Sequence, residues 1–167
     1  ANTPKQCVYG EEVSMNFTAT MPVVSTQEIT QVNIAAGTAS FNGRVESLGD
    51  LGYTERGFVY GLAHNPTKDD SEIKVVSGTG VGSFSVNVTD LSMGKVYYVR
   101  AYIENAKGIV YGDEKILDFN PVMPEVVTGE FDFKSLTSVV FNGEITNVGD
   151  PAYTERGFVY GTMLIPT

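Results

Sequence analysis

The sequence contains one cysteine and one histidine, and it lacks tryptophan altogether. A single cysteine excludes an intrachain disulfide framework and a cysteine-based zinc site. A single histidine excludes any metal motif that needs two imidazoles. We therefore expect no metal ion and no cofactor.

Basic residues are also scarce. The 11 Lys and Arg residues against 20 Asp and Glu residues give a net charge of −9, which is spread along the chain. Such a surface does not neutralise phosphates, so we expect no nucleic-acid partner. No apolar run approaches the roughly 18 residues of a transmembrane helix, so we expect no membrane insertion in this segment.

The chain nevertheless has enough apolar material for a packed core. Its 167 residues are 42% hydrophobic and 11% aromatic, a composition that argues against wholesale disorder. The length by itself predicts one domain or two small ones.

An internal repeat refines that estimate. Residues 41–67 and 141–167 are related by an offset of 100, and 16 of their 27 positions are identical. A second similarity relates CVYGEEVSMNF (7–17) to IVYGDEKILDF (109–119), with an offset of 102. Two independent similarities in a consistent order predict a tandem array.

The similarities also order the chain into units. A weaker one relates MPVVST near Pro22 to MPEVVT near Pro124. Residues 1–20 then correspond to the last strand of a preceding repeat, and 21–120 to one complete unit. Residues 121–167 correspond to the first strands of a following, truncated repeat. The chain is thus expected to be a window cut from a longer array.

The complete unit shows alternation with period two, bounded by Gly, Asn, Asp and Pro, and no convincing 3.6-residue period. Seven strands in about 100 residues, with turn signals every 8–12 residues, predict an all-β antiparallel sandwich. The predicted strands are 24–34, 39–45, 53–60, 73–76, 84–88, 97–104 and 110–119.

One segment carries a family resemblance. LSMGKVY (91–97), followed by VRAYIENAKG, resembles the sixth-strand region of fibronectin type III domains. The resemblance implies that Leu91 plugs the end of the sandwich and that the Tyr97 hydroxyl returns to the backbone. Lys115 departs from the family pattern, which has an apolar residue there.

The strings YYVRAYIENAKGIVYGDE and TERGFVYG are more closely similar to fibronectin type III-like repeats of Bacteroidetes cell-surface and secreted proteins. The resemblance implies tandem immunoglobulin-like β-sandwiches, one complete and two partial, at an extracellular or cell-surface location. Without tryptophan, we expect Phe58, Tyr60 and Phe84 to fill the core.

TERGFVYG occurs twice, at 54–61 and 154–161. Glu55 and Arg56 could form a pair that contacts a ligand. We favour the alternative of a central strand, in which Gly57 allows close backbone approach and Arg56 lies over apolar surface with its charge in water.

Tyr98, Arg100 and Tyr102 form the candidate partner-binding stripe. Their alternation is expected to place them on the outer face of their sheet. Tyr and Arg are enriched at binding hot spots, and aromatic faces suit sugar rings. Ordinary cross-strand packing is the alternative.

Other polar features favour structural roles. The GTGVG run at 78–82 resembles a phosphate loop, but a strand follows it, so we expect a hairpin turn. Asp69, Asp70 and Glu72 could hold calcium, yet their spacing favours a solvated acidic loop. His64 is expected to be a surface loop residue with no triad partner nearby.

Cys7 aligns with Ile109 and is predicted to be a small apolar strand residue. Asn16 and Asn87 begin glycosylation sequons, which matter only in a eukaryotic producing cell.

These features predict a non-catalytic structural or adhesion module. A carbohydrate- or protein-binding module of a nutrient-capture or attachment system is the alternative. Expected partners are neighbouring repeats or copies of the same chain, and a glycan or surface protein. Both partial units are expected to expose unpaired strand edges, which invite strand addition from another chain.

Overall fold

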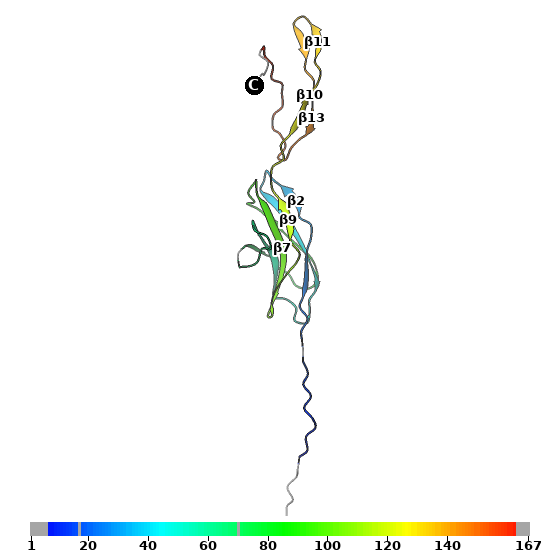
Figure 1. Cartoon of the computed structure of the whole chain (residues 1–167), viewed down its shortest axis with the longest axis vertical. Coiled ribbons are helices and arrows are strands. Elements are labelled where there is room, and N and C mark those ends of the chain that lie inside the picture. Colours follow the sequence, from blue (N-terminus) through cyan, green and yellow to red (C-terminus); the bar gives the residue numbers. More distant parts are fainter. Residues whose placement is uncertain (1–6, 17, 70, 163–167) are drawn as a thin grey trace, which may run out of the picture.

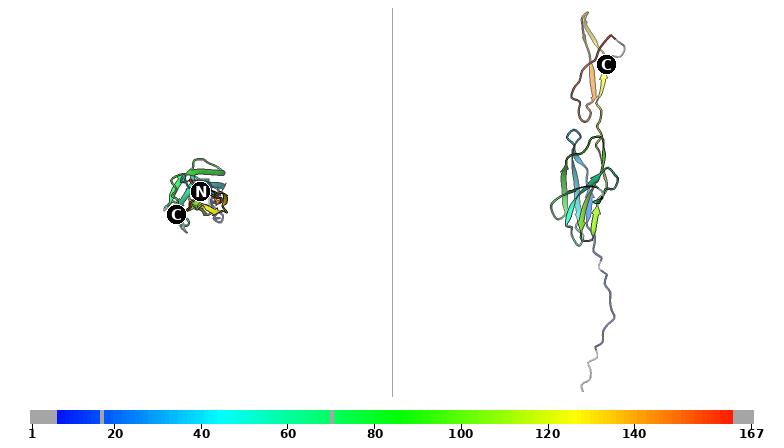
Figure 2. Two further views of the ribbon diagram at one scale, coloured as in Figure 1. Left: turned by 90° about the horizontal axis from the view of Figure 1, so that it is seen from above. Right: turned by 90° about the vertical axis from the view of Figure 1, so that its left-hand side faces the viewer.

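The computed structural model describes residues 7–16, 18–69 and 71–162. Within these residues all regular structure is β-strand, the sheets are antiparallel, and there is no helix. Figure 1 shows an extended N-terminal segment, a central sandwich and a smaller strand-containing part, following one another along the long axis. The second side view in Figure 2 shows the same arrangement.

The first sheet of the sandwich is built on β3 (Thr38–Ser47). β6 (Gly82–Val88) pairs with β3 from Ala39 to Val45. β1 (Val23–Thr26) and β2 (Thr30–Asn33) pair with β3 as well, so they follow its other edge end to end. The predicted single strand 24–34 is therefore two strands. Asn42 Nδ2 donates to the Glu28 carbonyl at 2.8 Å, and this contact holds the intervening bulge.

The second sheet has β4 (Glu55–Gly61) between β5 (Glu72–Val75) and β7 (Val96–Asn105). β8 (Gly108–Tyr111) and β9 (Lys115–Asp118) follow the far edge of β7. The predicted strand 110–119 is thus also broken in two, at residues 112–114.

The break at 112–114 exists because β1 crosses there. The Thr26 hydroxyl accepts a hydrogen bond from the Ala101 amide at 2.9 Å, and the Gly112 amide donates to the Ala101 carbonyl at 2.8 Å. A Cβ on Gly112 would lie 2.6 Å from the nitrogen and from the hydroxyl oxygen of Thr26. Only glycine allows this close approach.

The core lies between the two sheets and is centred on aromatic rings. The Phe41 ring of β3 contacts the rings of Phe58 and Tyr60 of β4, with centroids 5.9 and 5.3 Å apart. Phe84 of β6 lies 5.1 Å from Phe58. All four side chains are buried, and the prediction that Phe58, Tyr60 and Phe84 fill the core is confirmed. A Cβ on Gly43 would lie 2.7 Å from the Phe84 ring, so the missing side chain makes room for that ring.

The contact implied for Tyr97 is present. Its hydroxyl accepts a hydrogen bond from the Ser92 amide at 2.9 Å, and the Leu91 side chain is buried beside the core. Lys115 lies opposite Val99 on β7, and its ammonium group forms an ion pair with Glu28 in the bulge between β1 and β2. The departure at Lys115 is thus accommodated by pairing across the edges of the two sheets.

Residues 121–162 contain two smaller pairs of strands. β10 (Glu125–Thr128) pairs with β13 (Gly143–Asn147), and β11 (Asp132–Ser135) pairs with β12 (Ser138–Val140). These two ladders repeat the pairing of β1 and β2 with β3. Paired residues of β10 and β11 lie 102 positions after their counterparts in β1 and β2, and those of β12 and β13 lie 100 positions after their counterparts in β3. The register shift in β10 is at the position equivalent to the shift in β1.

Two predicted strands are absent. Residues 154–161 form no strand, although Phe158 and Tyr160 stack on Phe141 at 5.6 Å. The identical string forms β4 because β5 and β7 flank it, and the described part of 121–162 has no counterparts of those strands. Residues 7–16 likewise form no strand, because no neighbouring strand among the described residues pairs with them. Their correspondence to the last strand of a preceding repeat stays a prediction.

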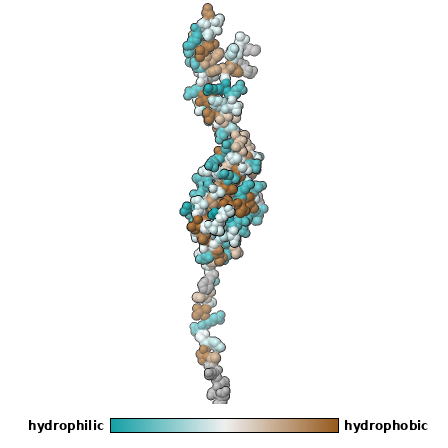
Figure 3. All heavy atoms as spheres, turned by 180° about the vertical axis from the view of Figure 1, so that it is seen from behind, coloured by the Kyte–Doolittle hydropathy of each residue, from teal (hydrophilic) through white to brown (hydrophobic). Residues whose placement is uncertain are grey.

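Because these segments lack neighbouring strands in the described part of the chain, many of their hydrophobic side chains are exposed. Tyr9 and Val13 are 87% and 83% exposed, and Cys7 is exposed instead of lying in a strand as an apolar residue. Hydrophobic side chains also reach the surface of residues 121–162, as Figure 3 shows for one face.

The GTGVG segment at 78–82 also differs from the expectation of a hairpin turn. It links β5 in one sheet to β6 in the other, so it crosses between sheets and is not a hairpin turn.

Replacing Tyr97 with Phe is expected to lower the free energy of unfolding by about 1 kcal/mol, because the Ser92 amide loses its acceptor. Urea unfolding of the full chain measures the change. Tyr98→Phe, which removes a hydroxyl from the opposite face of the same strand, is the control. Equal stabilities of Tyr97→Phe and the unsubstituted chain would contradict a stabilising role for this contact.

Candidate partner-binding face

The candidate face is the outer surface of the sheet that contains β4 and β7. Side chains on β7 alternate as predicted: Val99 and Ala101 enter the core, and Tyr98, Arg100 and Tyr102 lie on the other side. The strand pattern therefore assigned the correct side of the sheet to the stripe.

Tyr102, however, is fully buried, which corrects the expectation of an exposed stripe. Its hydroxyl donates to Glu55 Oε1 at 2.6 Å, and Lys68 Nζ lies 5.0 Å from the ring centroid. Lys68 belongs to the connection between β4 and β5, so side chains of that connection cover the ring. Burial is the main cause that raises the pKa of Tyr102, and its hydrogen bond to Glu55 adds to this effect.

Lys68 links two carboxylates on this face. Glu55 and Glu104 are direct partners across β4 and β7, an arrangement in which two like charges repel. Lys68 Nζ lies 2.6 Å from Glu55 Oε1 and 2.5 Å from Glu104 Oε2. The Lys68 hydrogen bond lowers the pKa of Glu55, and the hydrogen bonds to Glu104 and Glu55 raise the pKa of Lys68. One ammonium group thus relieves the repulsion between the two strands.

Residues at the β8/β9 edge of the sheet hold the connection between β4 and β5 in place. The Tyr111 hydroxyl accepts from the Lys68 amide at 3.0 Å. Glu114 accepts from the Asn65 amide and lies 2.9 Å from His64 Nδ1. The backbone hydrogen bond from Asn65 is the largest cause that lowers the pKa of Glu114.

The accessible part of the face is a cluster of four side chains, His64, Tyr98, Arg100 and Glu114, which we call the His64–Tyr98 surface. The His64 side chain is 66% exposed, and its ring lies 3.9 Å from that of Tyr98. Arg100 donates through Nε to the Gly112 carbonyl at 2.9 Å. Two aromatic rings in contact, tilted by 41° and lying beside a cation and a carboxylate, suit recognition of a polar or sugar ligand.

Glu55 and Arg56 do not form a joint ligand site, because they point to opposite faces of β4. Arg56 lies over the Phe84 ring at 4.9 Å on the core side. Its Nη2 donates to the Ser77 carbonyl at 2.9 Å and its Nη1 to the Tyr53 hydroxyl at 3.3 Å, while its buried Nε has no partner. The apolar contact agrees with our expectation, and the guanidinium group also donates hydrogen bonds to two protein groups.

The acidic segment 68–72 forms no metal site in the part that the structure describes. Asp70 lies outside the described residues, and Lys68 is committed to the two glutamates. Apart from the undescribed positions, no group of three or more His, Cys, Asp or Glu residues could hold a metal ion. Within residues 7–16, 18–69 and 71–162, no helix is long and apolar enough to cross a membrane.

Sequence reasoning missed Lys68, Glu104 and Glu114 as parts of this face. Each meets at least one partner that lies 36 to 50 residues away in the chain. One signal was available: the Tyr-Gly-x-Glu pattern of 111–114 also occurs at 9–12.

Comparisons with known proteins add the following. No protein-family model and no curated protein sequence matches the chain. The solution structure of the sensor domain of the anti-sigma factor RsgI4 from Pseudobacteroides cellulosolvens is 15% identical, with a TM-score of 0.45, over 59% of this chain and 74% of that chain. A short form of the same sensor domain is 14% identical, with a TM-score of 0.45, over 59% of this chain and 94% of that chain. Likeness at this level carries no argument about function.

Lys68→Met removes both ion pairs and is expected to lower the free energy of unfolding by about 1–2 kcal/mol at pH 7. This magnitude lies between the contributions of exposed and of buried ion pairs to stability. Glu55 provides its stabilisation above its unfolded pKa and loses it as the pH falls through its lowered folded pKa. The Lys68 contribution is lost as the pH rises through its raised pKa. The deficit should therefore be largest between about pH 5 and 10.

Denaturant unfolding at several pH values measures this deficit. Lys95→Met removes an exposed lysine from the β6–β7 connection and is the matched control. A deficit for Lys68→Met that is unchanged at pH 3 would show that lost packing is responsible and not the ion pairs.

Proposed function

We propose that this chain is part of a non-catalytic, extracellular or cell-surface protein, in which fibronectin type III-like sandwiches are arranged in tandem as spacer or adhesion units. Residues 21–120 are one such unit. Its two sheets, β1/β2–β3–β6 and β5–β4–β7–β8/β9, and the Tyr97 hydroxyl contact support the resemblance.

The observation that carries the proposal is the recurrence of strand register. Val24 pairs with Val45 in the complete unit, and Val126 pairs with Ile145 further along the chain. The Asn42 side chain donates to the Glu28 carbonyl, and Asn142 donates to the Glu130 carbonyl at 2.7 Å. Recurrence in backbone pairing and in side-chain contacts favours successive copies of one supersecondary arrangement.

A specific observation favours a second candidate function. In the His64–Tyr98 surface the His64 side chain is exposed and the other three are half-buried, and Glu114 holds the β4–β5 connection in place. A preformed aromatic surface costs little entropy on binding. We therefore propose, as the alternative, a module that binds a glycan or a surface protein there.

The array proposal predicts an elongated particle. A compact chain of this length would have a radius of gyration of about 15 Å. Small-angle X-ray scattering of the full chain is expected to give a clearly larger value, together with the folded signature of the sandwich. A value near 15 Å would mean that the parts pack together into one globule, and it would contradict the spacer function.

If the alternative function is correct, two single substitutions in the His64–Tyr98 surface should each weaken ligand binding. His64→Ala and Tyr98→Ala are each expected to weaken binding by about tenfold or more, the effect of removing a hot-spot side chain. A glycan array and a pull-down from surface extracts are the screens, and titration with the captured ligand gives the affinity. Asn87→Ala, on the outer face of the other sheet, is the control. Unchanged affinity in both variants would reject this surface.

A further inference from the structure

We infer that one end of each sandwich is a docking surface for the chain that enters from the preceding unit, and that this contact fixes the direction in which successive units are joined. The surface consists of the turn between β3 and β4 and, in the complete unit, the turn between β7 and β8. The inference rests on the proposed array and specifies the partner of its units: the connector of the neighbouring repeat.

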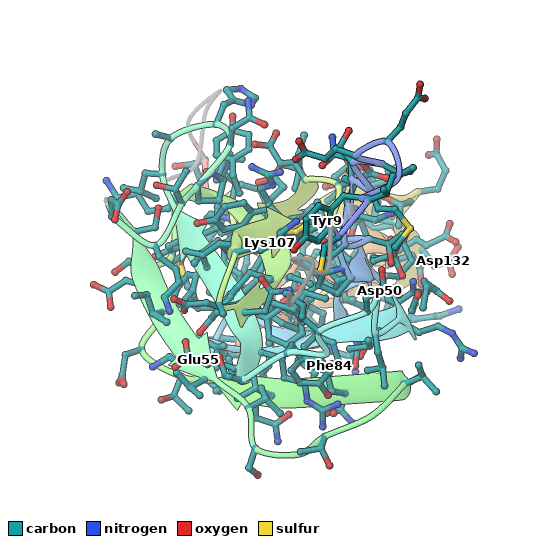
Figure 4. The ribbon with its side chains drawn as sticks, turned by 90° about the horizontal axis from the view of Figure 1, so that it is seen from below. Tyr9, Asp50, Glu55, Phe84, Lys107 and Asp132 are labelled. Carbon is teal, nitrogen blue, oxygen red and sulfur yellow. The ribbon has the colours of Figure 1, made fainter. Side chains whose placement is uncertain are left out.

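The first instance holds residues 19 and 20. Thr20 donates to Asp50 Oδ2 through its amide at 2.7 Å and through its hydroxyl at 2.9 Å, and the Asp50 amide donates back to the Thr20 carbonyl at 3.2 Å. Lys107 Nζ lies 3.4 Å from the Ala19 carbonyl. Figure 4, viewed from this end, shows Asp50 and Lys107 on either side of the incoming segment.

The second instance has the same place in the next unit. The Val122 amide donates to the Asp150 carbonyl at 2.8 Å, and the Asp150 amide donates to the Val122 carbonyl at 2.9 Å. Thr20 and Val122 are related by the offset of 102, and Asp50 and Asp150 by 100. In both instances the Asp amide donates to the connector carbonyl, whereas the connector amide donates to the Asp50 carboxylate in the first and to the Asp150 carbonyl in the second. Contacts at equivalent positions in two units indicate a surface that belongs to the fold itself.

A glycine makes the approach possible in both instances. Gly49 and Gly149 have φ angles of 61° and 74°, in the left-handed region. A Cβ on Gly49 would lie 2.5 Å from the Thr20 carbonyl oxygen, and one on Gly149 would lie 2.7 Å from that of Val122. Any side chain at either position would push the connector away.

The free length between units is therefore very short. Phe119 is still bonded to the sandwich, since its amide donates to the Lys95 carbonyl at 2.9 Å and its carbonyl accepts from the Gly94 amide at 3.0 Å. Val122 is already bonded to the next turn. Only Asn120 and Pro121 lie between these fixed points, and proline restricts φ further. A connector of two residues, fixed at both ends, holds an angle instead of acting as a free hinge.

The two instances differ in one testable respect. The first uses the carboxylate of Asp50, whose pKa is lowered mainly by the backbone hydrogen bond from Thr20, and Lys107 is the charged group that faces it. The second uses backbone groups alone. A folded pKa below the ordinary value means that the Thr20 contact is present at higher pH and is lost as the pH falls through the lowered pKa.

The experiment is backbone NMR of the full chain with Asp50→Ala, Asp150→Ala and the exposed-loop control Asp69→Ala. The Thr20 and Val122 amides are expected to exchange at least about tenfold more slowly than in an unstructured peptide. Asp50→Ala should abolish the protection of Thr20 and leave Val122 protected, whereas Asp150→Ala should leave both protected. The amide shift of Thr20 should titrate with a midpoint below the ordinary value of 3.8 for Asp.

Residual dipolar couplings test the fixed direction. Residues 23–47 and 125–147 are expected to fit a single alignment tensor. Unprotected Thr20 and Val122 amides, or two independent tensors, would overturn the inference. Such a result is distinguishable from failure of the array proposal, because scattering reports elongation whether the joints are fixed or free.

Discussion

The packing of Phe41 against Phe58 and Tyr60 is the contact on which the sandwich depends. β3 and β4 are joined by a short turn but belong to different sheets, and these rings hold the sheets together. Each fully buried large side chain contributes about 1.5–3 kcal/mol by leaving water, and edge-on aromatic pairs add to this. The same three ring positions lie together at Phe141, Phe158 and Tyr160, where the opposing strands are absent from the described residues.

The strand pattern predicted which way side chains point but not what covers them. Alternation placed Ala101 in the core and Tyr102 on the outer face, and both assignments are correct. Burial of Tyr102 depends on Lys68, which reaches the ring from another part of the chain. No local rule specifies such a contact. The Tyr97 hydrogen bond was implied by the family resemblance, and both of its partners lie within the one short motif that carries the resemblance.

The string TERGFVYG shows the limit of local reasoning most clearly. It is a strand at β4 and has no strand structure at 154–161, although the residues are identical. A strand exists only when its backbone groups have neighbours to pair with, and propensity does not supply neighbours. The candidate site followed the same rule: its outer-face location came from periodicity, whereas the ion pairs that shape it came from residues brought in by the topology.

The interruptions in the outer strands have a consequence for an array. Of the outer strands, β6 is seven residues long, whereas β1, β2, β5, β8 and β9 are each four residues long, and an interruption separates each of the pairs β1/β2 and β8/β9. A long, flat edge would template pairing with any neighbour, and the proposed tandem units would hold similar sequences at high local concentration. In the proposed array, the interruption at residues 112–114, where Gly112 meets Thr26, would shorten this edge and act against strand exchange between units.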